Sequence, residues 1–184
     1  MFGIFKKKQV PRPATSSLQM ELRSAVAPFL TIYENLSNEI TRSYNDLDHN
    51  PAELRFFSMA ATSLFIQAFG GLPQEKMQAL VGMFYEQSAA NLLLHMPRAD
   101  FSLVHTAATE RFGLYADPIM AVINADTGEA VQDANLALVT ILDGRLKAER
   151  GAFDQSIAGL TISSALVDSA VQVKNAAESV RGIF

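Results

Sequence analysis

Apolar positions recur at helical spacing along most of the chain. The clearest series runs from residue 18 to residue 47 in steps of three or four, which average about 3.6 residues, the period of one helix face. Pro28 lies inside this series, where proline removes a backbone donor and clashes with the preceding turn, so we expect a kink or a break there. The members of the series are Leu18, Leu22, Val26, Phe29, Tyr33, Leu36, Ile40, Tyr44 and Leu47.

Proline and glycine mark the limits of the next two helices. Asn50 followed by Pro51 is typical of an N-cap and a first helical position, and Gly70-Gly71 predicts the end of that helix. Pro73 opens a third helix, which we expect to end before Pro97. Its apolar face is predicted to contain Met77, Leu80, Val81, Phe84, Ser88, Leu92 and His95.

The second half of the chain repeats this organisation. A fourth helix is predicted from about Arg98, and Asp117-Pro118 restarts its pattern. The turn at residues 126–128 leads into a long segment to about Arg150, and a last helix is expected over about residues 153–181. No segment shows the sustained alternation of a strand. We therefore expect an all-α, single-domain helical bundle of about six or seven helices over residues 16–184, preceded by an arm and linker at residues 1–15.

The stretch from Phe56 to Gln74 contains no charged residue and resembles a membrane span in composition. However, it contains Gln67 and is interrupted by Gly70-Gly71, whereas a span needs about 20 predominantly apolar residues in one helix. Apolar side chains on all sides are also typical of a helix surrounded by other helices. We interpret this stretch as a buried central helix.

Charge is distributed unevenly. The net charge is −4, with 15 basic and 19 acidic residues. Residues 1–13 contain four of the basic residues, Lys6, Lys7, Lys8 and Arg12, and no acidic one, so the remaining 11 basic and 19 acidic residues give −8. An acidic body argues against nucleic acid as a partner, because phosphate binding requires a basic face. Cysteine is absent, which excludes disulfides and thiolate chemistry.

The arm combines Phe2, Ile4 and Phe5 with three lysines at positions 6–8. At an anionic membrane each basic group contributes about 1 kcal/mol of binding free energy, so we expect one arm to bind weakly and reversibly. Several arms on one oligomer would strengthen this binding. Docking on a protein partner and a passive tail are the open alternatives. The order of basic and apolar residues is the reverse of that in a secretory signal, so we expect a cytoplasmic protein, peripheral at the inner membrane face.

The last helix carries small residues among its apolar ones. Gly159, Ser163 and Ser169 are spaced so that another helix can approach closely. They are therefore a candidate oligomer face, and packing within the chain is the alternative. A homo-oligomer is expected on this basis.

Signals for an enzyme are weak. The sequence contains no P-loop, no GxGxxG, no GxSxG and no HExxH motif. Paired Glu-x-x-His motifs for a helical di-metal site are also missing, so no catalytic residue, metal or cofactor is predicted. The strongest candidates for a pocket are Tyr85, Glu86, His95 and His105.

These observations favour a non-enzymatic helical interaction protein, such as an adaptor, scaffold or assembly component, with a protein partner. Two alternatives stay open. One is a ligand-binding or enzymatic bundle with a pocket near the four residues above, and the other is a regulatory subunit of a larger complex.

Overall fold

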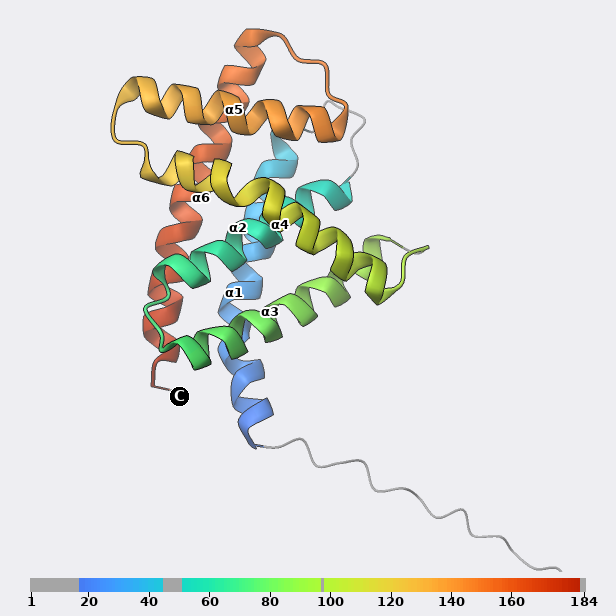
Figure 1. The fold of residues 1–184 in the computed structure, drawn as a ribbon, viewed down its shortest axis with the longest axis vertical. Helices are drawn as coiled ribbons and strands as arrows, with labels where there is room; N and C mark the ends of the chain where they lie inside the picture. The colour runs from blue at the N-terminus through green and yellow to red at the C-terminus, as the bar shows by residue number, and fades with distance from the viewer. Residues whose placement is uncertain (1–16, 45–50, 97, 183–184) are drawn as a thin grey trace, which may run out of the picture.

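The computed structural model describes residues 17–44, 51–96 and 98–182, and these residues form six α-helices and no strand (Figure 1). The prediction of an all-α bundle is thereby confirmed. The helices are α1 Ser17–Arg42, α2 Pro51–Phe69, α3 Gln74–His95, α4 Phe101–Asn124, α5 Gly128–Leu146 and α6 Ala152–Val180.

Two long helices run lengthwise through the molecule and the other four cross them. Figure 1 shows α1 and α6 along the long axis, with α5 crossing near one end and α2, α3 and α4 crossing further along. Helix α2 packs against α1, α3, α4 and α6. Most of its residues are buried, which confirms the interpretation of the uncharged stretch as a central helix.

The apolar face of α1 forms one wall of the core. Val26, Phe29, Tyr33, Leu36 and Ile40 are all fully buried, as is Tyr44 in the turn that follows the helix. The Tyr33 ring meets Phe84 of α3 edge-on, with the ring centroids 6.1 Å apart. Phe57 of α2 and Tyr115 of α4 make a similar contact at 5.1 Å. Leu47 and the predicted N-cap Asn50 lie outside the described residues.

Both internal prolines are tolerated without a break. Helix α1 continues through Pro28, and α4 continues through Pro118, where a restart was expected. A proline leaves the carbonyl four residues earlier without its helical donor. Those carbonyls belong to Ser24 and Leu114, both exposed residues, so water can satisfy them.

Capping residues set three helix ends more sharply than the apolar pattern predicted. Asp100 accepts a hydrogen bond from the Leu103 N–H at 2.8 Å, so α4 begins at residue 101 rather than near Arg98. Thr127 caps α5 in the same way. Lys147 adopts a left-handed conformation with φ of 55°, which ends α5 four residues before the expected position near Arg150.

Candidate functional site

Helix α6 has two apolar faces, of which the bundle covers one. Its inner face packs against α1, α2, α4 and α5. The outer face carries large apolar side chains that are exposed by 76% at Phe153, 49% at Ile157, 62% at Leu160, 48% at Val167 and 54% at Val171. Together with the exposed Ser164 between them, we call these residues the α6 stripe.

The α6 stripe is regular. Its positions 153, 157, 160, 164, 167 and 171 follow one another in alternating steps of four and three. At 3.6 residues per turn they fall within an arc of about 80° on the helix surface. This spacing is typical of a helix seam that packs against another helix. Leu136 of α5, 44% exposed, extends the apolar surface, because it lines the same cavity as Leu160.

The small residues proposed as an oligomer face occupy other sides of α6. Gly159 is buried against α5, where an added Cβ would lie 3.1 Å from the Asn135 Cβ and 3.5 Å from the Val139 Cγ2. Ser169 is 4% exposed. Ser163 is half-buried and donates its hydroxyl to the Leu160 carbonyl at 3.1 Å. Close packing across Gly159 is therefore made within the chain.

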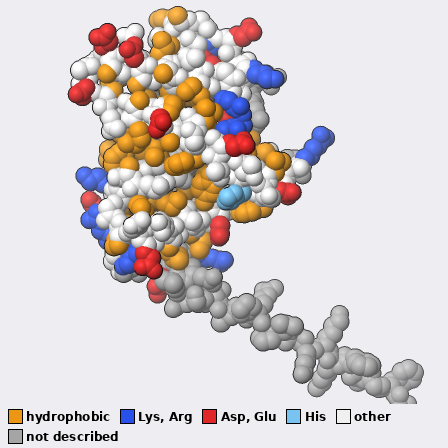
Figure 2. Space-filling model, in the orientation of Figure 1, with side chains coloured by type: hydrophobic (Ala, Val, Ile, Leu, Met, Phe, Trp, Pro, Cys, Tyr) orange, Lys and Arg blue, Asp and Glu red, His pale blue; other side chains and the backbone are white. Residues whose placement is uncertain are grey.

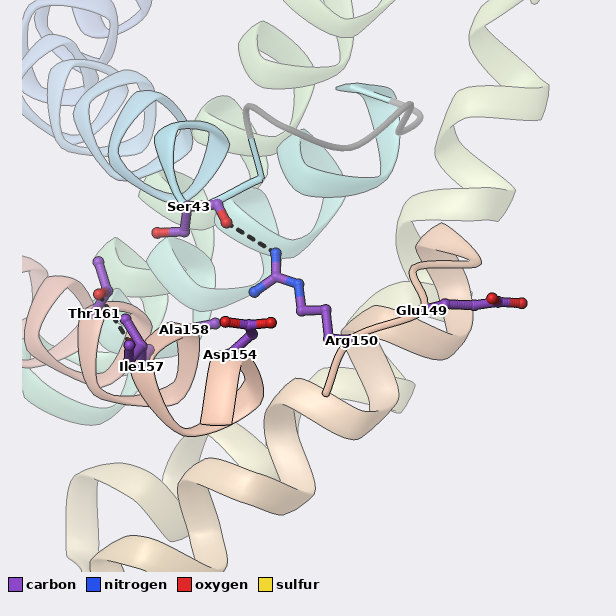
Figure 3. A pocket seen from close by; sticks show the side chains of 7 residues that line it. All are labelled: Ser43, Glu149, Arg150, Asp154, Ile157, Ala158 and Thr161. Atoms are coloured by element: carbon purple, nitrogen blue, oxygen red, sulfur yellow. Dashed lines mark hydrogen bonds between the residues drawn. The ribbon is translucent and has the colours of Figure 1, made fainter. Parts of the chain in front are cut away.

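Four hollows border the outer side of α6, and the smallest, about 220 Å³, lies beside Val167 and Val171 and is also lined by Phe69 and Ile123. The largest, about 680 Å³, runs between α6 and the end of α1 and includes the charged residues Glu39, Arg42 and Asp168. A second, about 390 Å³, lies above it at the α5–α6 loop (Figure 3). The third, about 340 Å³, separates α5 from α6 beside Asn135. The apolar stripe thus has carboxylates on its α1 side, where Asp154 and Asp168 line the first two hollows.

Arg150 closes the hollow drawn in Figure 3. Its guanidinium donates to the Ser43 carbonyl at 2.8 Å, while the Glu149 side chain points away. It also lies 3.7 Å from the Asp143 carboxylate and stacks over the Tyr44 ring, 3.9 Å from the ring centroid. Because the charge of Arg150 is already engaged, this group fastens the α5–α6 loop to the end of α1.

Tyr44 is the buried partner of that ion pair. Its hydroxyl donates to Asp143 Oδ1 at 3.0 Å, and Gln155 donates to Oδ2 of the same carboxylate at 3.3 Å. Burial raises the pKa of Tyr44, and the Asp143 charge raises it further. The tyrosine therefore stays neutral and acts as a hydrogen-bond donor.

A second buried carboxylate, Glu53, joins three helices. Arg111 donates to both of its oxygens, at 2.8 and 3.1 Å, and the Tyr115 hydroxyl donates at 2.6 Å. Arg145 of α5 approaches to 3.4 Å. Burial is the main cause of the raised pKa of Tyr115, and the hydrogen bond to Glu53 raises this pKa further. Neither carboxylate cluster can be recognised in the sequence, because the members of each lie far apart along the chain.

The four candidate pocket residues are only partly brought together. The Tyr85 and His105 rings meet edge-on, with centroids 5.9 Å apart, and burial raises the pKa of Tyr85. Glu86 and His95 are both exposed. None of the four hollows around α6 includes any of these residues.

The arm residues Phe2, Ile4, Phe5, Lys6, Lys7 and Lys8 lie outside the described residues. Within the described part of the chain, no group of three or more histidine or acidic side chains is placed to hold a metal ion. There, α6 is the one helix long and apolar enough to cross a membrane, and 39% of its most apolar window is buried in the bundle.

Hydrophobic side chains also gather on the face that Figure 2 shows, over α4 and α5, with charged side chains mainly toward the margins.

Comparison of the chain with protein-family models, with curated proteins and with solved structures finds no match.

Proposed function

We propose that this chain is a non-enzymatic interaction protein, an adaptor, scaffold or assembly component, that binds a protein partner through the outer face of α6. One observation carries the proposal: five large apolar side chains of the α6 stripe are 48–76% exposed at the spacing of a helix seam. Isolated exposed apolar residues are normal on protein surfaces, whereas contiguous ones mark interaction sites.

The structure suggests why this face is apolar. A helix that only covered its own bundle would need one apolar stripe, with polar residues opposite. In α6, Ile162, Leu166 and Val173 already meet that need. No residue of the α6 stripe belongs to the described core, so the benefit of the second stripe is expected in binding.

Site-specific photo-crosslinking in cells that produce this protein tests the proposal. A photoreactive residue is placed at Leu160 or Val167, and in control variants at Leu94 or Leu103, which are 79% and 54% exposed on other helices. Adducts of higher mass at the α6 positions alone are expected. Equal labelling at all four positions, or no adduct at any, would overturn the proposal.

The N-terminal arm is proposed as a weak contact to anionic membrane at the inner face, with the body remaining in the cytoplasm. The support is the sequence of residues 2–8, in which three apolar side chains precede three lysines. Substituting Lys6, Lys7 and Lys8 together with Glu should abolish flotation with anionic vesicles and leave the melting temperature unchanged. A chain lacking residues 1–13 should behave in the same way. If both variants float as well as the full chain does, the arm is not a tether.

A further inference from the structure

We propose that the partner of the α6 stripe is a second copy of this chain, and that the two α6 helices pair antiparallel about a two-fold axis that passes between Leu160 and Ser164 on the exposed face. This inference rests on the proposed function and names the occupant of the same surface. It moves the self-association face from the small residues predicted by the sequence to the large residues on the other side of the helix.

The order of residues along the stripe supports pairing with itself. Steps of four, three, four, three and four read the same in both directions, so an antiparallel copy places each stripe position opposite another. Phe153 then meets Val171 of the second copy, Ile157 meets Val167, and Leu160 meets Ser164. A two-fold axis repeats each pair, as an interface between identical surfaces requires.

Side-chain size favours the antiparallel direction over the parallel one. The N-terminal half of the stripe has the bulky residues Phe153, Ile157 and Leu160, and the C-terminal half has the smaller Ser164, Val167 and Val171. Antiparallel pairing puts a bulky residue opposite a smaller one at every layer. Parallel pairing would put phenylalanine on phenylalanine and serine on serine, leaving crowded and empty layers, and both are destabilising.

The exposed area is close to what a dimer needs. An aromatic side chain buries on the order of 150–250 Å² and an aliphatic one somewhat less, so the five apolar residues of the stripe and Leu136, which are 44–76% exposed, offer roughly 600 Å². The polar residues that border them supply further area. A standard interface takes about 800 Å² from each partner.

The charges around the stripe give the pairing a distinctive salt dependence. No stripe position is charged. Lys174 borders one edge of the stripe, whereas at the α1 edge the acidic Asp154, Asp168 and Glu39 outnumber the basic Arg42. In an antiparallel pair the α1 edges of the two copies approach one another, so added salt should screen their repulsion and also favour apolar burial. Moderate salt should therefore strengthen the pairing. Binding of the lysine arm to vesicles should weaken under the same conditions.

The mass of the purified full chain is the first test. Light scattering with sedimentation velocity should give a concentration-dependent approach to about 40 kDa, twice the chain mass of 20.0 kDa. Leu160→Glu and Val167→Glu should each raise the dissociation constant at least tenfold. The matched control Leu103→Glu, at a similarly exposed site on α4, should leave it unchanged. A mass of 20 kDa at all concentrations would overturn the proposal.

Disulfide trapping tests the direction of pairing, and the absence of native cysteine makes the background clean. A mixture of the Phe153→Cys and Val171→Cys chains should form a crosslinked dimer on mild oxidation, and Leu160→Cys with Ser164→Cys should do the same. Phe153→Cys alone should not, because the two copies of position 153 would lie about 27 Å apart at 1.5 Å per residue, far beyond disulfide reach. Crosslinking of Phe153→Cys with itself and not with Val171→Cys would overturn the antiparallel pair.

The two proposals fail in different ways. A monomeric purified chain that still gives photo-adducts at Leu160 in cells, with masses that are not multiples of 20 kDa, would overturn the second copy as partner and support the docking surface. An absence of adducts in cells together with a monomeric purified chain would overturn both. In each case, circular dichroism and thermal unfolding of the glutamate variants must match those of the wild type.

Discussion

The Tyr115 hydroxyl lies 2.6 Å from Glu53 Oε1, deep between α2 and α4. Arg111 of α4 donates hydrogen bonds to both oxygens of the same carboxylate, and Arg145 of α5 forms an ion pair with it. One side chain near the start of α2 therefore ties together three helices that are otherwise joined by apolar packing. Such a carboxylate is costly to remove, because its partners remain buried without it.

Glu53→Ala is expected to lower the free energy of unfolding by about 3–5 kcal/mol, the range found when one partner of a buried ion pair is deleted. The loss arises because Arg111, which is 16% exposed, and the buried Tyr115 hydroxyl would stay shielded from water but would lose the carboxylate that they bind. Urea denaturation at neutral pH, followed by circular dichroism, measures it.

Glu86→Ala provides the matched control, since it removes an exposed carboxylate from α3. A substitution of that kind should change the free energy of unfolding by no more than about 0.5 kcal/mol. If the two variants lose similar amounts of free energy of unfolding, the Glu53 cluster does not stabilise the contact between the three helices.

Alkaline pH should destabilise the fold through its buried tyrosines. The pKa values of Tyr44 and Tyr115 are both raised above the ordinary value of 10.0, mainly by burial. The unfolded chain releases these protons near pH 10 while the folded chain keeps them. Their contribution to stability is therefore complete below pH 10 and is lost as the pH rises toward the folded pKa, by up to about 1.4 kcal/mol per pH unit for each tyrosine.

Urea denaturation at pH 8, 10 and 11 measures this loss. The double variant Tyr44→Phe, Tyr115→Phe is less stable at pH 8, because two hydrogen bonds are missing, but its stability should decline less between pH 10 and pH 11. An equal decline in the wild type and the double variant would assign the alkaline loss to other groups.

The sequence predicted the helices well because their signal is local. The spacing of Val26, Phe29 and Tyr33 required only that one face of α1 be buried, and that face is buried. The sequence predicted a kink or a break at Pro28 and a restart at Pro118, whereas both helices continue through the proline. The carbonyls that lose their donors belong to exposed residues, which the spacing of apolar positions does not reveal. The first residue of α4 is set by the capping side chain of Asp100, and the spacing of apolar positions does not reveal this cap.

The candidate site was harder to predict, since it depends on which face of α6 the bundle covers. Both Gly159 and Leu160 lie at helical spacing from apolar neighbours, and only contact with α5 shows that the first is buried and the second exposed. Glu53 and Arg111 lie 58 residues apart, so neither could be matched to the other before the fold was known.

Asn135 offers a test of an unsatisfied buried amide. Its side chain is 5% exposed, and neither the amide nitrogen nor the oxygen has a hydrogen-bond partner among the described residues. Removing such a group relieves a desolvation penalty of about 1–3 kcal/mol, so Asn135→Ala should raise the free energy of unfolding by about 1 kcal/mol. Leu138→Ala, one turn further along α5 and 1% exposed, should instead lower it by about 2–5 kcal/mol. If denaturation shows a loss of more than about 1 kcal/mol for Asn135→Ala, the amide has a partner that stabilises it.

The contact between α5 and α6 at Gly159 gives the last prediction. Alanine is normally favoured over glycine within a helix by about 1 kcal/mol. At Gly159 the added Cβ would lie 3.1 Å from the Asn135 Cβ, an atom fixed to the α5 backbone, so the two helices must move apart by a few tenths of an ångström. Overpacking of this kind costs about 1–3 kcal/mol, which exceeds the gain in propensity.

Gly159→Ala should therefore lower the free energy of unfolding by about 1 kcal/mol, and Gly159→Val by more, since its larger side chain increases the overpacking. Gly113→Ala is the matched control, because it also lies within a helix and a Cβ there meets nothing within 4 Å. That variant should be more stable than the wild type by up to about 1 kcal/mol. Opposite signs for the two alanine variants in denaturation experiments would show that Gly159 is held by contact with α5. Stabilisation by both would mean that α6 can move away from α5 without loss.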